Sequence, residues 1–369
     1  MQLLGKVLIN YNEIKKMKGI ILHGGHGTRL RPLTHTGPKQ LLPIANKPMS
    51  QYCLEAIRDC GINDIAIIIG GIGSQKVKEY YGDGEKFGVK LTYIEQDEPK
   101  GIAHAINLCK DFVGNEKFLT FLGDNIIQKS IHDISKKFET SDNDALVLLC
   151  EVPNPEQFGI AELTDNKISK IIEKPKNPTT NLAVTGIYFL TPKIFEIFSK
   201  LKPSWRNELE ITDSLQIMLE EKCKISFEMI TDYWKDTGTP SDIIHANAEI
   251  LKNMNSYFLG TQNNNSEITG NLMLGKNSQI LENSKIVGPC IVGDDCIIGP
   301  NVTLGSNVSV GNNSKISHCT IQNSIIMQNC IIESKISLHD SIIASNSKIV
   351  NTKSNENRTY LLGEGTVIS

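Results

Sequence analysis

Residues 291–311 read Ile-Val-Gly-Asp-Asp-Cys-Ile-Ile-Gly-Pro-Asn-Val-Thr-Leu-Gly-Ser-Asn-Val-Ser-Val-Gly, so that an aliphatic residue followed by glycine returns every six positions. The aliphatic register extends beyond this stretch and comprises Leu274, Ile280, Ile286, Val292, Ile298, Leu304, Val310 and Ile316. A second register holds mostly small residues, namely Ser278, Ser284, Cys290, Cys296, Val302, Val308 and Ser314. This period predicts a parallel β-helix of hexapeptide repeats, in which every sixth side chain stacks inside a prism.

The repeat also indicates where this domain begins and ends. Its phase slips after Ile316 and resumes through Ile326, Ile332 and Leu338, which predicts an irregular coil. We expect the β-helix to occupy residues 268–352, followed by a tail at 353–369. A polar, asparagine-rich stretch at 260–267 precedes it, and we interpret residues 252–267 as a linker.

The chain before the linker has a different pattern, in which apolar runs alternate with helical stretches. The predicted strands are Ile20–Leu22, Ile65–Ile69, Val89–Ile94, Phe118–Leu122 and Ala145–Cys150. The predicted helices between them include Met49–Arg58, Gln75–Tyr80 and Ala103–Cys109. This alternation predicts that residues 17–251 form an α/β domain with a doubly wound, mostly parallel, Rossmann-like sheet. The ligand site of such a sheet lies at the carboxyl ends of its strands.

The first predicted strand ends in a glycine-rich loop. The loop reads Leu22-His23-Gly24-Gly25-His26-Gly27-Thr28-Arg29-Leu30 and is followed by Pro38-Lys39-Gln40. Bare backbone N–H groups beside an arginine and a lysine suit a polyphosphate. The loop lacks the Gly-Lys-Ser/Thr ending of a P-loop, and Leu30 stands where a dinucleotide-binding pattern has its third glycine. The latter argues against an NAD-dependent dehydrogenase.

Composition narrows the classes of protein further. Among the 369 residues, 38 basic and 41 acidic side chains give a net charge of −3 without a dense basic block, which argues against a general nucleic-acid binder. No apolar stretch has the length of a membrane span. Nine scattered cysteines without zinc-site spacing indicate reduced thiols in a cytoplasmic protein. Residues 1–16 show no signal-peptide pattern, and we assign this N-terminal extension no role.

Two motifs resemble those of the sugar-1-phosphate nucleotidylyltransferases. They are Gly24-Gly25-x-Gly27-Thr28-Arg29-Leu30-Arg31-Pro32-Leu33-Thr34 and Pro38-Lys39-Gln40-Leu41-Leu42-Pro43. With Asn46-Lys47-Pro48-Met49 added, the chain is most similar to the long form of glucose-1-phosphate thymidylyltransferase, which carries a C-terminal left-handed β-helix. The resemblance implies transfer of a nucleotidyl group from dTTP or UTP to a hexose 1-phosphate, most simply glucose 1-phosphate, with release of pyrophosphate.

The resemblance also implies the residues that bind the nucleotide. The backbone of the glycine loop would wrap it, with contributions from Leu22, Gly24, Gly25, Gly27 and Thr28. Arg29 and Lys39 would contact the triphosphate as catalytic cations, while Gln96, Pro99 and Gly101 would read the base. An amide side chain can both donate to and accept from the edge of uracil or thymine, which favours a pyrimidine triphosphate.

The remaining implied roles concern the metal and the sugar phosphate. Asp124 and Asp236 would share Mg²⁺, which usually takes one or two carboxylates together with phosphate oxygens and water. Lys174 would bind the sugar phosphate as a third catalytic cation. The hexose would be framed by Phe158, Gly159, Glu173, Val184 and Trp234. Arg206 matches a family segment but is interpreted mainly as part of the architecture of this lobe, and His23, His26 and His35 are interpreted as packing or loop residues.

Two other functions stay open at this stage. A bifunctional enzyme would add an acyl-CoA site to the β-helix, with His318 or His339 as the base. A non-catalytic regulatory relative would be expected to have lost the phosphate-binding cations or the metal-binding acids, which are all present here. The open edges of a β-helix further predict a homo-oligomer.

Overall fold

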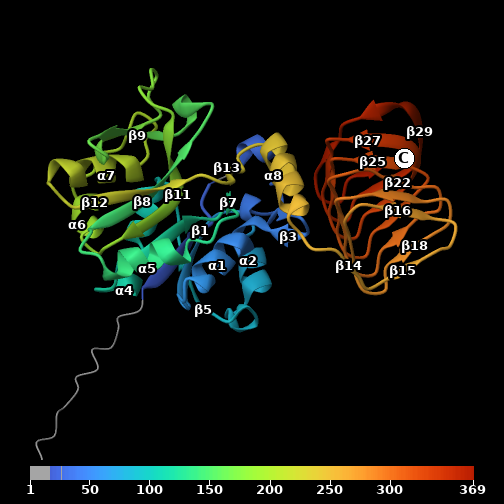
Figure 1. Ribbon diagram of the computed structural model, residues 1–369, viewed down its shortest axis with the longest axis horizontal. Coiled ribbons are helices and arrows are strands. Elements are labelled where there is room, and N and C mark those ends of the chain that lie inside the picture. Colours follow the sequence, from blue (N-terminus) through green and yellow to red (C-terminus); the bar gives the residue numbers. More distant parts are fainter. Residues whose placement is uncertain (1–16, 26) are drawn as a thin grey trace, which may run out of the picture.

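The computed structural model describes residues 17–25 and 27–369. The extension expected at residues 1–16 therefore lies outside the described residues, as does His26. Figure 1 shows two bodies: an α/β part, coloured blue to yellow, and a stack of coils, coloured orange to red. Helix α8 (Pro240–Lys252) stands between them, so the last helix of the first body adjoins the second.

The α/β part is organised around one mixed sheet. Its main path runs β10 (Lys167–Glu173), β9 (Gly159–Thr164), β11 (Leu182–Leu190), β6 (Phe118–Leu122), β1 (Lys18–Leu22), β4 (Asp64–Ile69) and β5 (Lys90–Glu95). Strand β8 (Ala145–Glu151) pairs with β11, and β12 (Ile225–Ile230) pairs with β8. Strands β6, β1, β4 and β5 are mutually parallel, whereas β11 runs antiparallel to its neighbours. The parallel strands end along one edge, where the predicted site lies.

Helices cover both faces of this sheet. They are α1 (Met49–Asp59), α2 (Ser74–Tyr81), α3 (Ile102–Asn107), α4 (Lys110–Val113), α5 (His132–Thr140), α6 (Ile194–Phe198) and α7 (Ile211–Glu220). Short 3₁₀ turns are η1 (Thr28–Leu30), η2 (Lys39–Leu41), η3 (Glu85–Phe87) and η4 (Pro155–Gln157). Because side chains alternate along a strand, Ile20 packs with Ile106 of α3 and Leu215 of α7, whereas Ile21 packs with Ile57 of α1 on the opposite face. This is the doubly wound arrangement predicted from the sequence.

Two short antiparallel pairs complete the α/β part. One is the hairpin of β2 (Pro43–Ile44) and β3 (Lys47–Pro48), and the other joins β7 (Asn125–Ile127) to β13 (Trp234–Asp236). The second pair brings together residues more than a hundred positions apart in the sequence. The predicted helix Ala103–Cys109 instead ends at Asn107, and α4 begins at Lys110.

The second body is the predicted β-helix. One face holds β14 (Tyr257–Phe258), β17 (Leu272–Leu274), β20 (Cys290–Val292), β23 (Val308–Val310), β26 (Ile325–Ile326), β28 (Ile342–Ile343) and β30 (Leu361–Leu362). A second face holds β15 (Thr261–Gln262), β18 (Gln279–Ile280), β21 (Ile297–Ile298) and β24 (Lys315–Ser317). A third holds β16 (Glu267–Thr269), β19 (Lys285–Val287), β22 (Thr303–Leu304) and β25 (Thr320–Gln322). The long strand β27 (Ile331–His339) joins these two faces, and β29 (Lys348–Arg358) and β31 (Val367–Ile368) follow it.

The strand register explains both the repeat and its slip. In the early coils, paired residues lie 18 positions apart, as in Leu272 with Cys290 and Cys290 with Val308, so each coil consumes three hexapeptides. In the later coils the spacing falls to 16 for Ser309 with Ile325 and to 17 for Ile325 with Ile342. Shortened turns therefore produce the phase slip, while the aliphatic register stays buried in one core. The left-handed β-helix predicted from the sequence is confirmed.

The boundaries predicted for this domain are too narrow. Strands β14 and β15 lie within the range expected to be a linker, 252–267, and β30 and β31 lie within the expected tail, 353–369. The polar stretch was interpreted as a linker, but asparagine is common in the turns of the coils. Asn264 and Asn265 form a turn within the stretch, and in later turns Asn277, Asn283 and Asn301 have φ angles of 55–59°. Asparagine tolerates this left-handed conformation better than most residues.

Two further sequence interpretations concern helices and thiols. Among the described residues, no helix combines the length and the hydropathy needed to cross a bilayer. Each of the nine cysteines lies in the described part of the chain and is a free thiol. Cys290 and Cys296 are buried in the interior of the coils, where they act as small apolar residues.

Candidate active site

The glycine loop leaves the sheet between two parallel strands. The backbone N–H of His23 still bonds the carbonyl of Ile68 at 2.9 Å, after which Gly25 and Gly27 turn the chain with φ angles of 96° and 57°. The hydroxyl of Thr34 donates to the carbonyl of Gly27 at 2.8 Å and so fixes the end of the loop. Thr28 and Arg29 follow in the exposed turn η1. The predicted phosphate loop is therefore held at the carboxyl end of β1.

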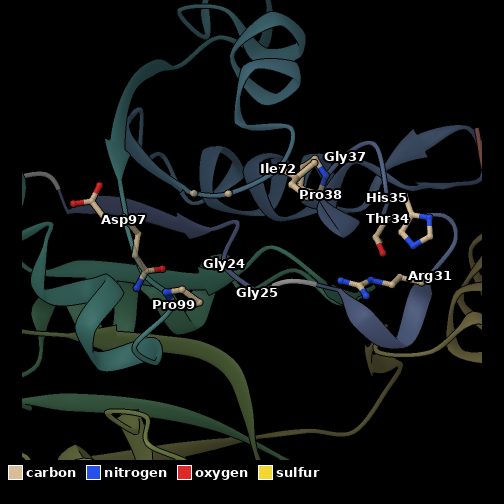
Figure 2. Close-up of a pocket in the computed structure, with 13 residues that line it drawn as sticks. Gly24, Gly25, Arg31, Thr34, His35, Gly37, Pro38, Ile72, Asp97 and Pro99 are labelled. Carbon is tan, nitrogen blue, oxygen red and sulfur yellow. The ribbon is translucent and has the colours of Figure 1, made fainter.

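Two cavities adjoin this loop. One is lined by Gly24 and Gly25 together with Arg31, Thr34 and His35 on one side and Asp97 and Pro99 on the other, as Figure 2 shows. The second cavity shares part of that wall and contains most of the residues predicted to bind nucleotide and metal. It is lined by Leu22, Gly24, Gly25, Lys39, Gln40, Gln96, Pro99, Gly101, Ile102, Ala105, Leu122, Asp124, Arg206 and Glu208.

Lys39 and Asp124 form a buried ion pair in the second cavity. The ammonium of Lys39 donates a hydrogen bond to Oδ2 of Asp124. Burial lowers the pKa of Lys39, but the charges of Asp124 and Asp236 outweigh it, so this pKa lies above its ordinary value. Burial raises the pKa of Asp124, but Lys39 and a hydrogen bond from Asn125 outweigh it, so this pKa lies below its ordinary value. Both groups are therefore charged at neutral pH.

Asp236 lies beside this pair because β13 is hydrogen-bonded to β7. Asp236 is opposite Asn125 in the register, and the backbone N–H of Thr237 donates to the carbonyl of Asp124 at 3.1 Å. Burial and the charge of Asp124 raise the pKa of Asp236 to about 6. The guanidinium of Arg29 reaches the same region, since a Cβ built on Gly238 would lie 3.0 Å from it. Two carboxylates and two cations thus converge at the carboxyl end of β6.

A divalent cation fits this set of residues. Burial is the larger cause of the raised pKa of Asp236, and repulsion by the charge of Asp124 adds to it. A cation between the two carboxylates would relieve that repulsion. Within the described residues, no group of three or more histidine, cysteine or acidic side chains is placed to enclose a metal. Phosphate oxygens and water would therefore complete the coordination, as is usual for Mg²⁺.

Gln96 is buried and anchored by a residue that the sequence did not single out. Its Nε2 lies 2.9 Å from Nδ1 of His104 on α3, while a Cβ on Gly24 would lie 3.6 Å from its Oε1. Gly101 has a φ angle of 105°, and a Cβ there would lie 2.4 Å from the carbonyl of Leu209. Backbone packing thus requires a glycine at position 101, and this residue also lines the second cavity. His104 lies eight residues after Gln96 and has no motif of its own to reveal it.

The sugar-side residues form a second polar cluster, outside the residues that line this cavity. Glu173 accepts a hydrogen bond from Thr212 at 2.9 Å and pairs with Arg206 at 3.3 Å and with Lys174 at 3.7 Å. Burial and the charge of Glu210 raise the pKa of Glu173. Because Arg206 lines the cavity and contacts Glu173, it connects this cluster to the Lys39–Asp124 pair. The sequence analysis interpreted Arg206 mainly as part of the architecture of this lobe. In the structure, Arg206 also lines the cavity.

Asn125 organises the aromatic side of the site. Its Oδ1 accepts from the indole of Trp234 at 2.8 Å and from the backbone of Gly186 at 3.1 Å, and its amide donates to Asp124 at 3.2 Å. The rings of Phe158 and Trp234 meet edge to face at 5.6 Å. Asn125 was missed as a functional residue, although its place directly after Asp124 was a signal.

Two other predicted sugar contacts take different positions. Gly159 approaches Glu173 closely, since a Cβ there would lie 3.1 Å from its Oε2. Val184 is buried and belongs to the hydrophobic core on one face of the sheet. The side chain of Val184 is therefore occupied by core packing.

In the part of the chain that the structure describes, His23 and His35 lie in different surroundings. Burial lowers the pKa of His23 to about 3, although the charge of Asp124 opposes this. Among the described residues, neither ring nitrogen of His23 has a hydrogen-bond partner. His23 is thus a neutral packing residue, whereas His35 lines the first cavity.

The two histidines considered for acyl transfer have structural partners in the β-helix. His318 occupies a turn with a φ angle of 58°, where Nδ1 lies 3.3 Å from the amide of Asn301 one coil away. The Nε2 of His339 lies 3.3 Å from Oγ of Ser337 on the same strand. The side chains of both histidines are therefore engaged in contacts within the β-helix itself.

Comparison with known proteins gives the following matches. The profile of the nucleotidyl transferase family matches residues 18–253, and that of the GMPPB C-terminal domain matches residues 286–369. The low-salt glycan biosynthesis nucleotidyltransferase Agl11 of Haloferax volcanii is 44% identical over 263 residues, which are 71% of this chain and 74% of that protein. Glucose-1-phosphate thymidylyltransferase of Streptomyces griseus is 39% identical over 72% of this chain and 74% of its own.

A solved structure agrees with these matches. It is described as a glucose-1-phosphate thymidylyltransferase from Bacillus anthracis in complex with sucrose. It shares 41% identity with this chain at a TM-score of 0.61, covering 66% of this chain and 98% of its own. The similarity therefore covers the α/β part that carries the site.

Proposed function

Because this chain belongs to the nucleotidyl transferase family and is a sugar-1-phosphate nucleotidyltransferase, we propose that its substrates are glucose 1-phosphate and dTTP or UTP. The products would be dTDP-glucose or UDP-glucose and pyrophosphate. The two named thymidylyltransferases among its relatives support the choice of a pyrimidine nucleotide. So does the position of Gln96 in the cavity next to the glycine loop.

One observation carries the proposal: Lys39, Asp124 and Asp236 converge at the carboxyl end of β6, beside the glycine loop. A triphosphate needs backbone donors, cations and a carboxylate-bound metal within a few ångströms of one another. The glycine loop, Lys39 with Arg29, and the two aspartates supply these three elements. Asp124 and Asp236 would hold Mg²⁺, which when bound neutralises charge on the phosphate oxygens.

The chemistry requires no covalent intermediate with the protein. A phosphate oxygen of the sugar phosphate attacks the α-phosphorus of the triphosphate and forms a new P–O bond, while the bond to the β-phosphate breaks and pyrophosphate leaves. The chain's own task is to align the two substrates and neutralise their charge. Lys39 and Arg29 bind the triphosphate, and Lys174 binds the incoming phosphate.

Base recognition would depend on the anchored amide of Gln96. When Nε2 of Gln96 donates to His104, its Oε1 can accept from the N3–H of a uracil or thymine ring. On the sugar side, Glu173 would accept hydrogen bonds from the hexose hydroxyls, and Phe158, Gly159 and Trp234 would frame the ring. A homo-oligomer and a cytoplasmic location stay predictions from the sequence.

The direct test is pyrophosphate release by the purified full chain with Mg²⁺ and glucose 1-phosphate. The five nucleotides dTTP, UTP, GTP, CTP and ATP would be compared at equal concentration. Turnover with dTTP or UTP alone is expected, and galactose 1-phosphate and mannose 1-phosphate serve as sugar controls. Turnover with GTP or ATP alone would contradict the assignment of the base. Release of free CoA from acetyl-CoA in the presence of an amino sugar phosphate would instead favour the bifunctional alternative.

A further inference from the structure

The β-helix packs directly against the segment that links the two catalytic cations of the first domain. This segment, residues 31–38, follows Arg29 and precedes Lys39; we call it the 31–38 segment. Its Leu33 is buried in a core cluster that also contains Ile325, Met327 and Ile342 of the β-helix. The contact is therefore hydrophobic and continuous between the two domains, and it adjoins the active site.

The 31–38 segment has two sides with different neighbours. On one side, Arg31, Thr34 and His35 line the cavity beside the glycine loop. On the other side, the segment meets the last turn of the β-helix, between β30 and β31. A Cβ built on Gly363 of that turn would lie 3.2 Å from both Cβ and the carbonyl oxygen of Pro32. The backbone of the last coil thus touches the rear of the cavity wall.

Glu364, the next residue in that turn, makes polar contacts to the first domain at this end of the interface. Its Oε2 accepts a hydrogen bond from the hydroxyl of Thr36 at 2.5 Å and pairs with the ammonium of Lys76 at 2.9 Å. Its Oε1 accepts from the amide of Asn346 on the neighbouring coil at 3.3 Å. The carboxylate is therefore fixed within the β-helix while it holds two residues of the first domain.

The two residues held by Glu364 do not line this cavity themselves, but each lies in an element next to one of its walls. Thr36 lies in the 31–38 segment, and Lys76 lies in the first turns of α2, whose preceding loop contributes Gly70, Gly71 and Ile72 to the cavity. These walls also touch each other, since a Cβ on Gly73 would lie 2.7 Å from Cα of Gly37. The carboxylate of Glu364 thus connects the 31–38 segment to α2.

We propose that Glu364 is a positioning residue, whose carboxylate holds the 31–38 segment and α2 in the arrangement that binds the triphosphate. The β-helix would then contribute to nucleotide binding without touching the nucleotide. The chain of contacts runs from Glu364 through Thr36 to the segment, and from Thr34 to the carbonyl of Gly27 in the glycine loop. The identity of the occupant as a triphosphate rests on the proposed function; the mechanical role of Glu364 does not.

The test uses the full chain with matched substitutions at the two ends of one hydrogen bond. Glu364→Ala removes the carboxylate, Thr36→Val removes only the hydroxyl, and Glu364→Gln keeps an acceptor for Thr36 while it removes the charge that attracts Lys76. The double variant Thr36→Val/Glu364→Ala completes a mutant cycle. Glu333→Ala, at an exposed carboxylate on β27 of the same β-helix, is the control.

The first readout is steady-state kinetics. Loss of a partly exposed ion pair and hydrogen bond of this kind in Glu364→Ala is expected to raise the KM for the triphosphate by about threefold to tenfold. The KM for the sugar phosphate and the melting temperature are expected to stay unchanged. Glu364→Gln should recover part of the loss, and the double variant should be no worse than Glu364→Ala. Additive losses, or a loss equal to that of Glu333→Ala, would overturn the proposal.

The second readout is hydrogen exchange, which needs no substrate. Peptides that cover the 31–38 segment and the start of α2 are expected to exchange faster in Glu364→Ala and Thr36→Val than in the wild type and in Glu333→Ala. Unchanged exchange at both walls would overturn the positioning role. If the wild type fails to release pyrophosphate from dTTP and UTP, the proposed function is wrong, and the exchange measurement still decides the role of Glu364.

Discussion

The ammonium of Lys39 donates a hydrogen bond to the carboxylate of Asp124, although 85 positions separate the two residues in the sequence. Both side chains are largely shielded from solvent, with 15% and 11% of their surface exposed. A buried ion pair seldom adds net stability, because removing two charges from water costs about as much as their attraction returns. The pair is therefore better explained by the proposed binding of a triphosphate than by a contribution to stability.

Replacing Lys39 by methionine should separate these roles. We expect Lys39→Met to lower kcat by about 10²–10³-fold, since one donor to a developing phosphate charge is lost. It should also destabilise the metal-free protein by about 3–5 kcal/mol, because Asp124 and Asp236 would then repel each other without a buried cation between them. Pyrophosphate release and urea unfolding measure the two effects. Lys47→Met, which breaks the ion pair with Glu55 outside the cavity, is the matched control and should retain activity.

Replacing Asp236 should have opposite effects on activity and stability. In Asp236→Asn, the loss of one metal-binding carboxylate should lower kcat by roughly two to three orders of magnitude. The metal-free protein should gain on the order of 1–2 kcal/mol, since the burial of the charge and its repulsion by Asp124, which together raise the pKa of Asp236, both disappear. Asp232→Asn changes an exposed carboxylate four residues earlier and should alter neither kcat nor the stability of the metal-free protein. A variant with normal turnover would remove Asp236 from the metal site.

The raised pKa of Asp236 also predicts how the effect of Mg²⁺ depends on pH. Since the folded-state pKa is about 6 against an ordinary value of 3.8, the folded protein retains a proton that the unfolded chain has lost between these values. The stability from this group is present below pH 4 and is lost as the pH rises through about 6. Above that pH the ionised carboxylate is available to a cation.

The increase in melting temperature caused by Mg²⁺ should therefore grow between pH 5 and pH 7.5, as Asp236 ionises with its pKa of about 6. Melting curves with Mg²⁺ and with EDTA across this range measure it. Asp236→Asn should abolish the pH dependence of the increase. An increase of equal size at both ends of the range would contradict the assignment.

The sequence predicted the interior of both domains because their patterns are local. The six-residue period requires only that successive coils repeat, and Asp124 could be placed at the end of a strand from the apolar run before it. Contacts between remote segments leave no such pattern. Nothing near Glu364 indicates that it meets Thr36, and nothing near His104 indicates that it anchors Gln96. The first coil was missed for a related reason, since the asparagines of its turns resemble a flexible linker.

Asn247 offers a test of how the two domains are joined. This buried side chain on α8 accepts from the backbone of Ala45 at 2.8 Å and from the hydroxyl of Ser309 at 2.6 Å, and it donates to the carbonyl of Asn307 at 3.2 Å. Asn247→Leu would leave these groups buried without partners, at a cost of about 2–4 kcal/mol.

We expect this cost to appear as unfolding at a lower urea concentration, with faster hydrogen exchange around the three partners of Asn247, which are Ala45, Asn307 and Ser309. Asn253→Leu, at an exposed asparagine just after the same helix, should change the unfolding free energy by less than about 0.5 kcal/mol. Equal stabilities for the two variants would show that the amide is dispensable at the domain contact.

Base selection provides the last prediction, because it depends on a hydrogen bond behind the ligand. His104 holds the amide of Gln96 at 2.9 Å and so fixes which of its atoms faces the cavity. His104→Ala frees that amide to rotate, and we expect kcat/KM for the preferred pyrimidine triphosphate to fall by about fivefold to tenfold. The kcat/KM values for the other triphosphates should change less, so that the preference for one triphosphate over the others decreases.

Two further variants make this interpretation specific. Gln96→Ala should narrow discrimination at least as much as His104→Ala, and adding the second substitution to the first should have little further effect, since His104 acts through Gln96. Asn107→Ala, at an exposed position on the same helix, controls for general damage to α3. If His104→Ala lowered kcat/KM equally for all five triphosphates, the histidine would support the fold of the site, and base selection would have to come from other residues of the cavity.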